Sequence, residues 1–142
     1  MELDKIGIAT GDTKEDCKQR KSFIMDFYKK WETANPQKQI FNKSLKDFVN
    51  VKHISVKETT GQASRRHIST LAITFLSEIL ENAVQKGIPQ NSNPAKDNQK
   101  SFEKIIVMEY NKKEFGKIKL TVGVKRGTKE KVQYCITAIE NG

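Results

Sequence analysis

The sequence predicts an α+β fold, in which an N-terminal helix and a long central helix pack on a C-terminal antiparallel meander of three to four strands. Two observations support this prediction. Apolar residues recur at helical spacing through residues 68–83, and they then recur at every second position through residues 116–126. A doubly wound nucleotide-binding fold is excluded, because it would need strands that alternate with helices along the chain.

The length of the chain predicts a single domain. A chain of 142 residues can bury a core without disulfides or bound metal. Within residues 1–142 we expect a loose leader at 1–12, an N-terminal helix and connector at 13–58, and a helix followed by a β-meander at 59–142. The sequence contains no internal repeat that would divide the domain further.

The cysteines and the apolar segments indicate a cytoplasmic protein. Cys17 and Cys135 are far apart and form neither a disulfide framework nor a CxxC metal motif. No apolar segment reaches the length of a signal-peptide core or of a membrane span. Phosphate-binding glycine motifs and the HExxH zinc motif are missing, and the only histidines are His53 and His67. We therefore predict no membrane partner, no metal site and no cofactor.

Residues 13–34 have the pattern of an amphipathic helix. Thr13 and Asp16 resemble a capping box at its start. Pro36 marks its end, because a proline disfavours the α conformation of the residue before it. We expect Trp31 to belong to the core, with stacking on a nucleobase as the alternative role. The apolar stripe of this helix consists of Cys17, Ile24, Phe27, Tyr28 and Trp31.

Three segments are predicted to connect the main elements. Residues 44–48 resemble one short helical turn, and residues 49–57 resemble a strand or an irregular extended segment. Residues 87–100 are polar and rich in asparagine and proline, which is typical of a mobile surface loop.

The central helix is expected to begin with Thr59 or Thr60 as its N-cap and to end before Gly87, a favourable residue just beyond a helix C-terminus. Its apolar face is broad, so this helix should supply most of the helical side of the core. The face comprises Ile68, Leu71, Ala72, Phe75, Leu76, Ile79, Leu80 and Ala83.

The last third of the chain is predicted to form three antiparallel strands. Residues 101–110 are almost continuously apolar, as in a central strand. Residues 116–126 and 130–140 follow, joined by a turn at 126–129. Strict alternation places four residues of the middle strand toward the core: Ile118, Leu120, Val122 and Val124.

The charge of the chain indicates a polyanionic partner. Lysine and arginine number 26 against 17 acidic residues. A net charge of +9 on a small domain favours a nucleic-acid partner, although solubility alone could explain it. Alternation places Lys117, Lys119 and Lys125 on one sheet face. With Lys57 and Arg126 they are the predicted nucleic-acid-binding residues. A solvated sheet face with lysines that discourage edge pairing is the alternative explanation.

The segment SRRH, residues 64–67, concentrates candidate catalytic groups near the predicted head of the central helix. RNA cleavage without metal needs a base, an acid and cations for the charge at phosphorus. We predict His67 as acid or base, and Arg65 and Arg66 as phosphate clamps beside the free N–H groups of the helix. Alternatively, the arginines are solvated or paired with Glu58. The sheet offers further candidates for such a site: Lys119, Lys125, Tyr134 and Thr137.

A family resemblance points in the same direction. The LENA segment at 80–83, the IKLTV strand at 118–122 and the final-strand Tyr134 resemble the pattern of small α+β domains in polyvalent proteins of phages and conjugative elements. Those domains are grouped with the barnase–EndoU–colicin–RelE-like superfamily of RNases, and the resemblance covers about residues 57–140. It implies an RNase-toxin-like fold, RNA as the partner and an origin in a mobile genetic element.

Together these patterns predict an RNA-binding protein with an RNase-toxin-like fold that acts as a metal-independent endoribonuclease. A non-catalytic module that binds nucleic acid or a protein partner is the main alternative. A third hypothesis is that the protein is a protein–protein adaptor that uses the helix around residues 23–31.

Overall fold

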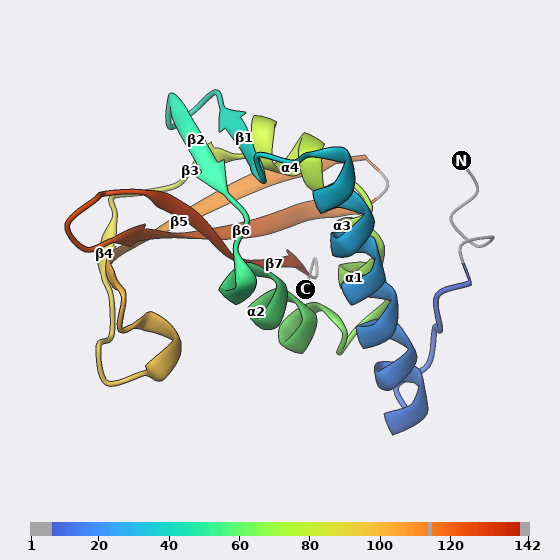
Figure 1. The fold of residues 1–142 in the computed structure, drawn as a ribbon. Helices are drawn as coiled ribbons and strands as arrows, with labels where there is room; N and C mark the ends of the chain where they lie inside the picture. Colours follow the sequence, from blue (N-terminus) through green and yellow to red (C-terminus); the bar gives the residue numbers. More distant parts are fainter. Residues whose placement is uncertain (1–6, 114, 140–142) are drawn as a thin grey trace.

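The computed structural model describes residues 7–113 and 115–139, and it confirms the α+β class (Figure 1). The helices are α1 (Lys14–Ala34), α2 (His53–Ala63), α3 (His67–Ile73), α4 (Leu76–Asn82) and the 3-10 turn η2 (Asp97–Gln99). The strands are β1 (Gln39–Asn42), β2 (Asp47–Asn50), β3 (Val84–Gln85), β4 (Gln90–Asn91), β5 (Phe102–Lys112), β6 (Gly116–Lys125) and β7 (Lys131–Ile139).

The sheet is larger and less regular than the predicted meander. Strands β5, β6 and β7 do form an antiparallel meander. They are the centre of a seven-stranded sheet with the order β1-β2-β7-β6-β5-β3, in which β4 also pairs with β5. The sheet is mixed, because β2 runs parallel to β7. The prediction of a purely antiparallel sheet of three to four strands is therefore wrong.

Strand β1 and residues 47–48 of β2 come from the segment that was predicted as a connector with a helical turn. Val49 and Asn50 of β2 belong to the segment 49–57 that was predicted as a strand or extended segment, and residues 53–57 of that segment are helical in α2 instead. Strands β1 and β2 form an antiparallel hairpin in which Ile40 lies opposite Val49 and Phe41 opposite Phe48. The turn of this hairpin contains Lys46 at a φ of 54°, a left-handed conformation that ends a strand and that most residues adopt rarely. Four-residue strands carry too little alternation to be recognised in a sequence.

Helix α1 agrees with the prediction. Thr13 and Asp16 form the full capping box, and the helix ends at Ala34. Trp31 belongs to the core, as expected, and its indole Nε1 donates a hydrogen bond of 2.9 Å to Ser77 Oγ. Residues 1–6 of the predicted leader lie outside the described residues.

The predicted long central helix is in fact three helices. Helix α2 begins at His53, earlier than predicted, so Thr59 and Thr60 lie inside it rather than at its N-cap. Bends at 64–66 and 74–75 then separate α2, α3 and α4. The predicted apolar face is nonetheless buried, except for the partly buried Ile68 and Phe75 at its margins.

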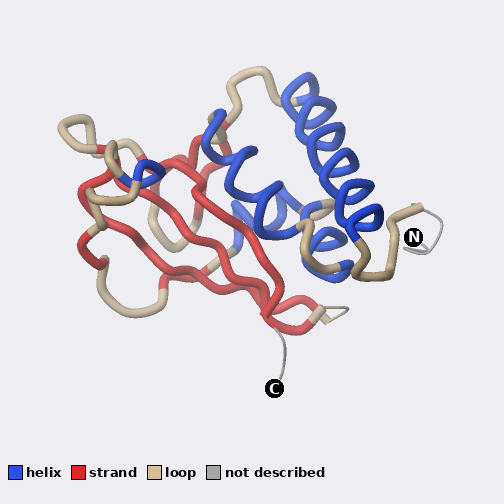
Figure 2. The backbone as a smooth tube through the Cα atoms, turned by 90° about the horizontal axis from the view of Figure 1, so that it is seen from below, coloured by secondary structure: helices blue, strands red, loops and turns tan. Residues whose placement is uncertain are grey.

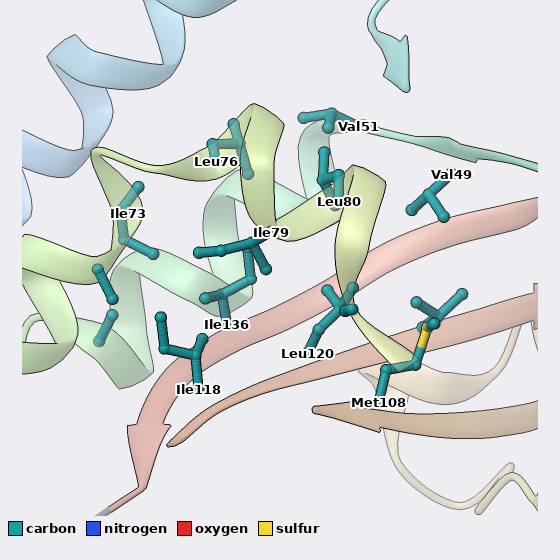
Figure 3. Packing of buried hydrophobic residues seen from close by; sticks show 14 of the residues in the cluster. Val49, Val51, Ile73, Leu76, Ile79, Leu80, Met108, Ile118, Leu120 and Ile136 are labelled. Atoms are coloured by element: carbon teal, nitrogen blue, oxygen red, sulfur yellow. The ribbon is translucent and has the colours of Figure 1, made fainter. Parts of the chain in front are cut away.

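The core lies between the helices and one face of the sheet. Figure 2 shows the helices grouped against one side of the strands. Ile73, Ile79 and Leu80 approach the meander from α3 and α4 (Figure 3). Leu120 and Ile136 meet them from β6 and β7, as strand alternation predicts. Within the described residues, every helix is too short or too polar to cross a membrane.

Candidate functional site

The predicted catalytic cluster lies at the bend between α2 and α3. Arg65 is exposed, whereas Arg66 and His67 are half-buried. Arg66 donates hydrogen bonds to the carbonyl oxygen of Ala138 and, at 3.3 Å, to Ser69 Oγ. The Nδ1 atom of His67 lies 3.1 Å from the carbonyl oxygen of Ala9. The cluster therefore follows α2 instead of heading a long helix.

A buried arginine that sequence reasoning missed shapes this bend. Arg20 of α1 has no exposed surface, and its Nε donates a 2.7 Å hydrogen bond to the carbonyl oxygen of Ser64. Its Nη1 donates to the carbonyl oxygens of Ala9 and Gly11 at 2.9 and 2.6 Å, and its Nη2 to that of Arg65 at 3.4 Å. Arg20 thereby ties residues 7–12 and the end of α2 to one point on α1.

The sequence did contain a signal for this role of Arg20. The residue lies three positions after Cys17 and four before Ile24, on the predicted apolar stripe of the helix. A charged residue on such a stripe is expected to be buried with hydrogen-bond partners.

A hollow with a mainly polar lining brings several predicted residues together. Its volume is about 300 Å³, and α2, strands β6 and β7 and the segment 92–101 form its walls. Figure 1 shows α2 and this gold segment on the same side of the sheet, below it in that view. We call the hollow the polar cavity. Its lining residues are Glu58, Gln62, Lys96, Asn98, Gln99, Lys119, Thr121, Tyr134, Cys135 and Thr137.

Strand register explains why the sheet residues of the polar cavity meet. Lys119 pairs with Thr137, and Thr121 pairs with Cys135, on the face opposite the core. A bulge follows Thr121, where the register shifts by one residue. The bulge turns Tyr134 to the same face as its neighbour Cys135. Three residues that were suggested from the sequence, Lys119, Tyr134 and Thr137, therefore share one site.

Helix α2 supplies the carboxylate. Glu58 and Gln62 are four residues apart and so lie on one face of the helix. Asn98 from the loop donates a 3.2 Å hydrogen bond from Nδ2 to Glu58 Oε1, which orients the carboxylate. The Oδ1 atom of Asn98 is buried and has no hydrogen-bond partner in the described structure. Sequence reasoning mentioned Glu58 only as a partner for the arginines.

The environment of Cys135 disfavours the thiolate form that a nucleophile needs. Burial, reinforced by the negative charge of Glu58, raises the pKa of its thiol to about 11. The positive charges of Lys119 and Arg65 act in the opposite direction on the same pKa. Arg65 itself is exposed at the bend after α2, three positions after the cavity residue Gln62.

Tyr134 forms part of the cavity wall as a neutral hydrogen-bond donor. Burial raises the pKa of its hydroxyl, and a hydrogen bond with Gln99 opposes that shift. Its ring meets Phe102 edge to face, with centroids 6.0 Å apart. Phe102 in turn lies on Gly123, where a Cβ atom would come within 2.7 Å of the ring. The glycine thus leaves room for the Phe102 ring against β6.

A second hollow extends the polar cavity along α2. Its volume is about 660 Å³, and it shares Glu58, Lys96 and Asn98 with the cavity. Its other lining residues include His53 and Lys57, the latter a predicted nucleic-acid contact. We call the two hollows together the polar groove.

The cations around the polar groove differ from the other predicted cations in having no carboxylate partner. Within the described part of the chain, Lys57, Arg65, Lys96 and Lys119 form no ion pair. The remaining predicted cations are engaged elsewhere: Lys117 Nζ lies 3.5 Å from Glu109, Lys125 Nζ lies 3.9 Å from Glu130, and Arg126 Nε donates to the carbonyl oxygen of Lys100. The lysines that line the groove therefore have no close ion pair with a described residue, although Glu58 and Asp97 also line it.

Comparison of the chain with models of protein families, with curated proteins and with solved structures gives no match. The resemblance to the barnase–EndoU–colicin–RelE-like superfamily thus stays a prediction. Among residues 7–113 and 115–139, no three His, Cys, Asp or Glu side chains are grouped as metal ligands would be.

Proposed function

We propose that this protein binds RNA in the polar groove and cleaves it there without a metal ion. One observation carries the proposal: the cavity gathers a single carboxylate, neutral donors and cations that no described carboxylate neutralises. A phosphodiester needs this combination of groups for both binding and charge stabilisation. The meander that follows the helices supports the proposed relation to RNase-toxin-like folds.

The proposed chemistry is an attack of the 2′-oxygen of RNA on the adjacent phosphorus. Glu58 accepts the proton of the 2′-hydroxyl as general base, and the bond from phosphorus to the 5′-oxygen breaks. The leaving 5′-oxygen takes a proton from the Tyr134 hydroxyl, which like any tyrosine hydroxyl is protonated at neutral pH. Lys119 and Arg65 stabilise the charge that develops on the phosphoryl oxygens. The products are a 2′,3′-cyclic phosphate and a 5′-hydroxyl.

This proposal assigns the base differently from the sequence-based hypothesis. His67 was predicted as acid or base, but it does not line the polar cavity, and its Nδ1 contacts a backbone carbonyl. Glu58 does line the cavity and has a free carboxylate oxygen besides the one that accepts from Asn98. His67 remains the competing candidate, so the two residues are compared directly in the experiment.

The test incubates purified protein with labelled tRNA and a generic RNA in the presence of EDTA. Wild type should give fragments that end in a cyclic phosphate. Glu58→Gln should cleave about 10²–10⁴-fold more slowly, because general-base catalysis contributes on that order, and it should still bind. Glu81→Gln on α4 is the matched control and should cleave like wild type.

Each other result leads to a different conclusion. Normal cleavage by Glu58→Gln together with loss of activity in His67→Ala would assign the base to His67. Binding that weakens with salt, without cleavage, would leave the non-catalytic nucleic-acid-binding module. The absence of both would contradict the proposal and favour a protein-binding module.

A further inference from the structure

Two aromatic side chains lie exposed next to each other on the β1–β2 hairpin. Phe41 and Phe48 are 46% and 43% exposed, and their ring centroids are 5.5 Å apart at an interplanar angle of 77°. Single exposed apolar residues are common on protein surfaces, but adjacent large ones mark interaction sites. The edge-to-face arrangement leaves ring surface available to a flat ligand.

The hairpin does not need these rings for its attachment to the core. Its other face provides that attachment through Ile40 and Val49. Asn42 is also buried there and donates hydrogen bonds from Nδ2 to the carbonyl oxygens of Leu80 and Ala83, at 2.8 and 3.0 Å. The contact between the two rings stabilises the strand pair. Smaller residues with a high strand propensity would also stabilise it, and they would expose less apolar surface.

The strand register places the two rings on the same sheet face as the polar cavity. Asn50 of β2 lies beside Val132 of β7. Phe48 precedes Asn50 by two residues and Tyr134 follows Val132 by two, so alternation turns both aromatic side chains to one face. Phe41 lies directly opposite Phe48 in the hairpin and shares that face.

The hairpin is also positively charged. Residues 37–52 contain four lysines and one aspartate. Asp47 pairs with Lys131 at 2.9 Å, and three of the lysines have carboxylate partners: Lys38 with Glu32, Lys43 with Glu81 and Lys52 with Glu130. Lys46 at the hairpin turn forms no ion pair with any described residue. Exposed aromatic rings among lysines are the combination that single-stranded nucleic acids bind, through base stacking and phosphate contacts.

We propose that Phe41 and Phe48 form a second RNA contact, at which unpaired bases stack while Lys46 neutralises a neighbouring phosphate. The inference rests on the proposed function, because both sites take RNA as their ligand, but it does not depend on cleavage. A stacking contact of this kind favours single-stranded RNA as the substrate, because the bases of a duplex are already stacked on one another and cannot stack on a side chain.

The experiment uses a fluorescent single-stranded 2′-O-methyl oligonucleotide, which lacks the attacking 2′-hydroxyl and therefore reports binding alone. Phe41→Ala and Phe48→Ala should each weaken binding about tenfold, because loss of one stacked base has an effect of that order. Phe41→Trp should retain wild-type affinity. Ile88→Ala is the matched control, because Ile88 is 83% exposed and lies outside the hairpin. None of these variants should change the affinity for a duplex formed by the same oligonucleotide and its complementary strand.

Several results would overturn the inference. Unchanged affinity of both alanine variants for the single strand would remove the stacking role while leaving the proposed function intact. Equal losses for single strand and duplex would indicate a general electrostatic or folding effect, which circular dichroism of Phe41→Ala would reveal. A wild-type dimer that Phe41→Ala dissociates would make the rings an interface between copies. No binding by wild type would overturn the proposed function as well.

Discussion

Replacing Arg20 by methionine should destabilise the protein by about 3 kcal/mol. Methionine fills a similar volume but leaves three carbonyl oxygens without the short hydrogen bonds of 2.6–2.9 Å that the guanidinium donates. Hydrogen bonds to a charged group contribute about 1.5–3 kcal/mol each. The desolvation of the buried guanidinium offsets part of their sum, which leaves a net effect of about 3 kcal/mol. A loss of that size lowers the Tm of a domain of this length by about 6–12 °C.

The assay is urea and thermal unfolding followed by circular dichroism. Lys21→Met is the matched control, because Lys21 is the exposed neighbour on the same helix and its substitution should change the free energy of unfolding by less than about 0.5 kcal/mol. Arg20→Lys should fall between the two, since an ammonium group cannot reach the same set of carbonyls. A loss of less than about 1 kcal/mol in Arg20→Met would refute the view that this arginine holds the bend and the residues before α1 together.

Three further predictions concern the sheet, alkaline pH and the groove. Gly123→Ala should cost about 1–3 kcal/mol in urea unfolding, because the added methyl group collides with the buried Phe102 ring. Burial raises the pKa of Tyr28 to about 12 from an ordinary value of 10.0, so the unfolded chain loses this proton first as pH rises. Stability should therefore fall by about 2–3 kcal/mol between pH 10 and 12, and Tyr28→Phe should lack this part of the loss in alkaline unfolding curves. Lys119→Met should weaken binding of the 2′-O-methyl oligonucleotide and reduce the slope of log affinity against log salt by about 0.7, whereas Lys117→Met, whose ammonium already has a carboxylate partner, should change both less.

The parts of the fold that could be predicted are those with a long local pattern. Helix α1 has a capping box, an apolar stripe and a terminating proline within its own sequence. The meander has strands of nine to eleven residues with clear apolar patterns. The β1–β2 hairpin has neither feature, and its pairing with β7 joins Asn50 to Val132 across a long stretch of chain. Such a contact leaves no local trace in the sequence.

Helix α2 shows why the site itself was predicted only in part. Its buried residues are mainly polar, among them Ser55 and Thr59, so no apolar stripe marks it as a helix. These residues are buried because they bond to β7: Ser55 Oγ donates to the carbonyl oxygen of Gln133, and Gln133 Nε2 donates to Thr59 Oγ1. Without a recognised helix, the sequence could not place Glu58 opposite the candidates on the sheet.

The edge of β7 that β2 leaves uncovered explains why polar side chains gather at the SRRH segment, residues 64–67. Strand β2 pairs with β7 only at residues 131–132. Beyond that point the backbone of β7 needs other partners, since an uncovered edge invites pairing with another chain. Ser69 Oγ accepts from the backbone N–H of Ala138 at 3.0 Å, and Arg66 donates to the Ala138 carbonyl oxygen. Of the two arginines of the segment, Arg66 is therefore committed to the sheet. Arg65, in contrast, is exposed, so its side chain stays available to solvent.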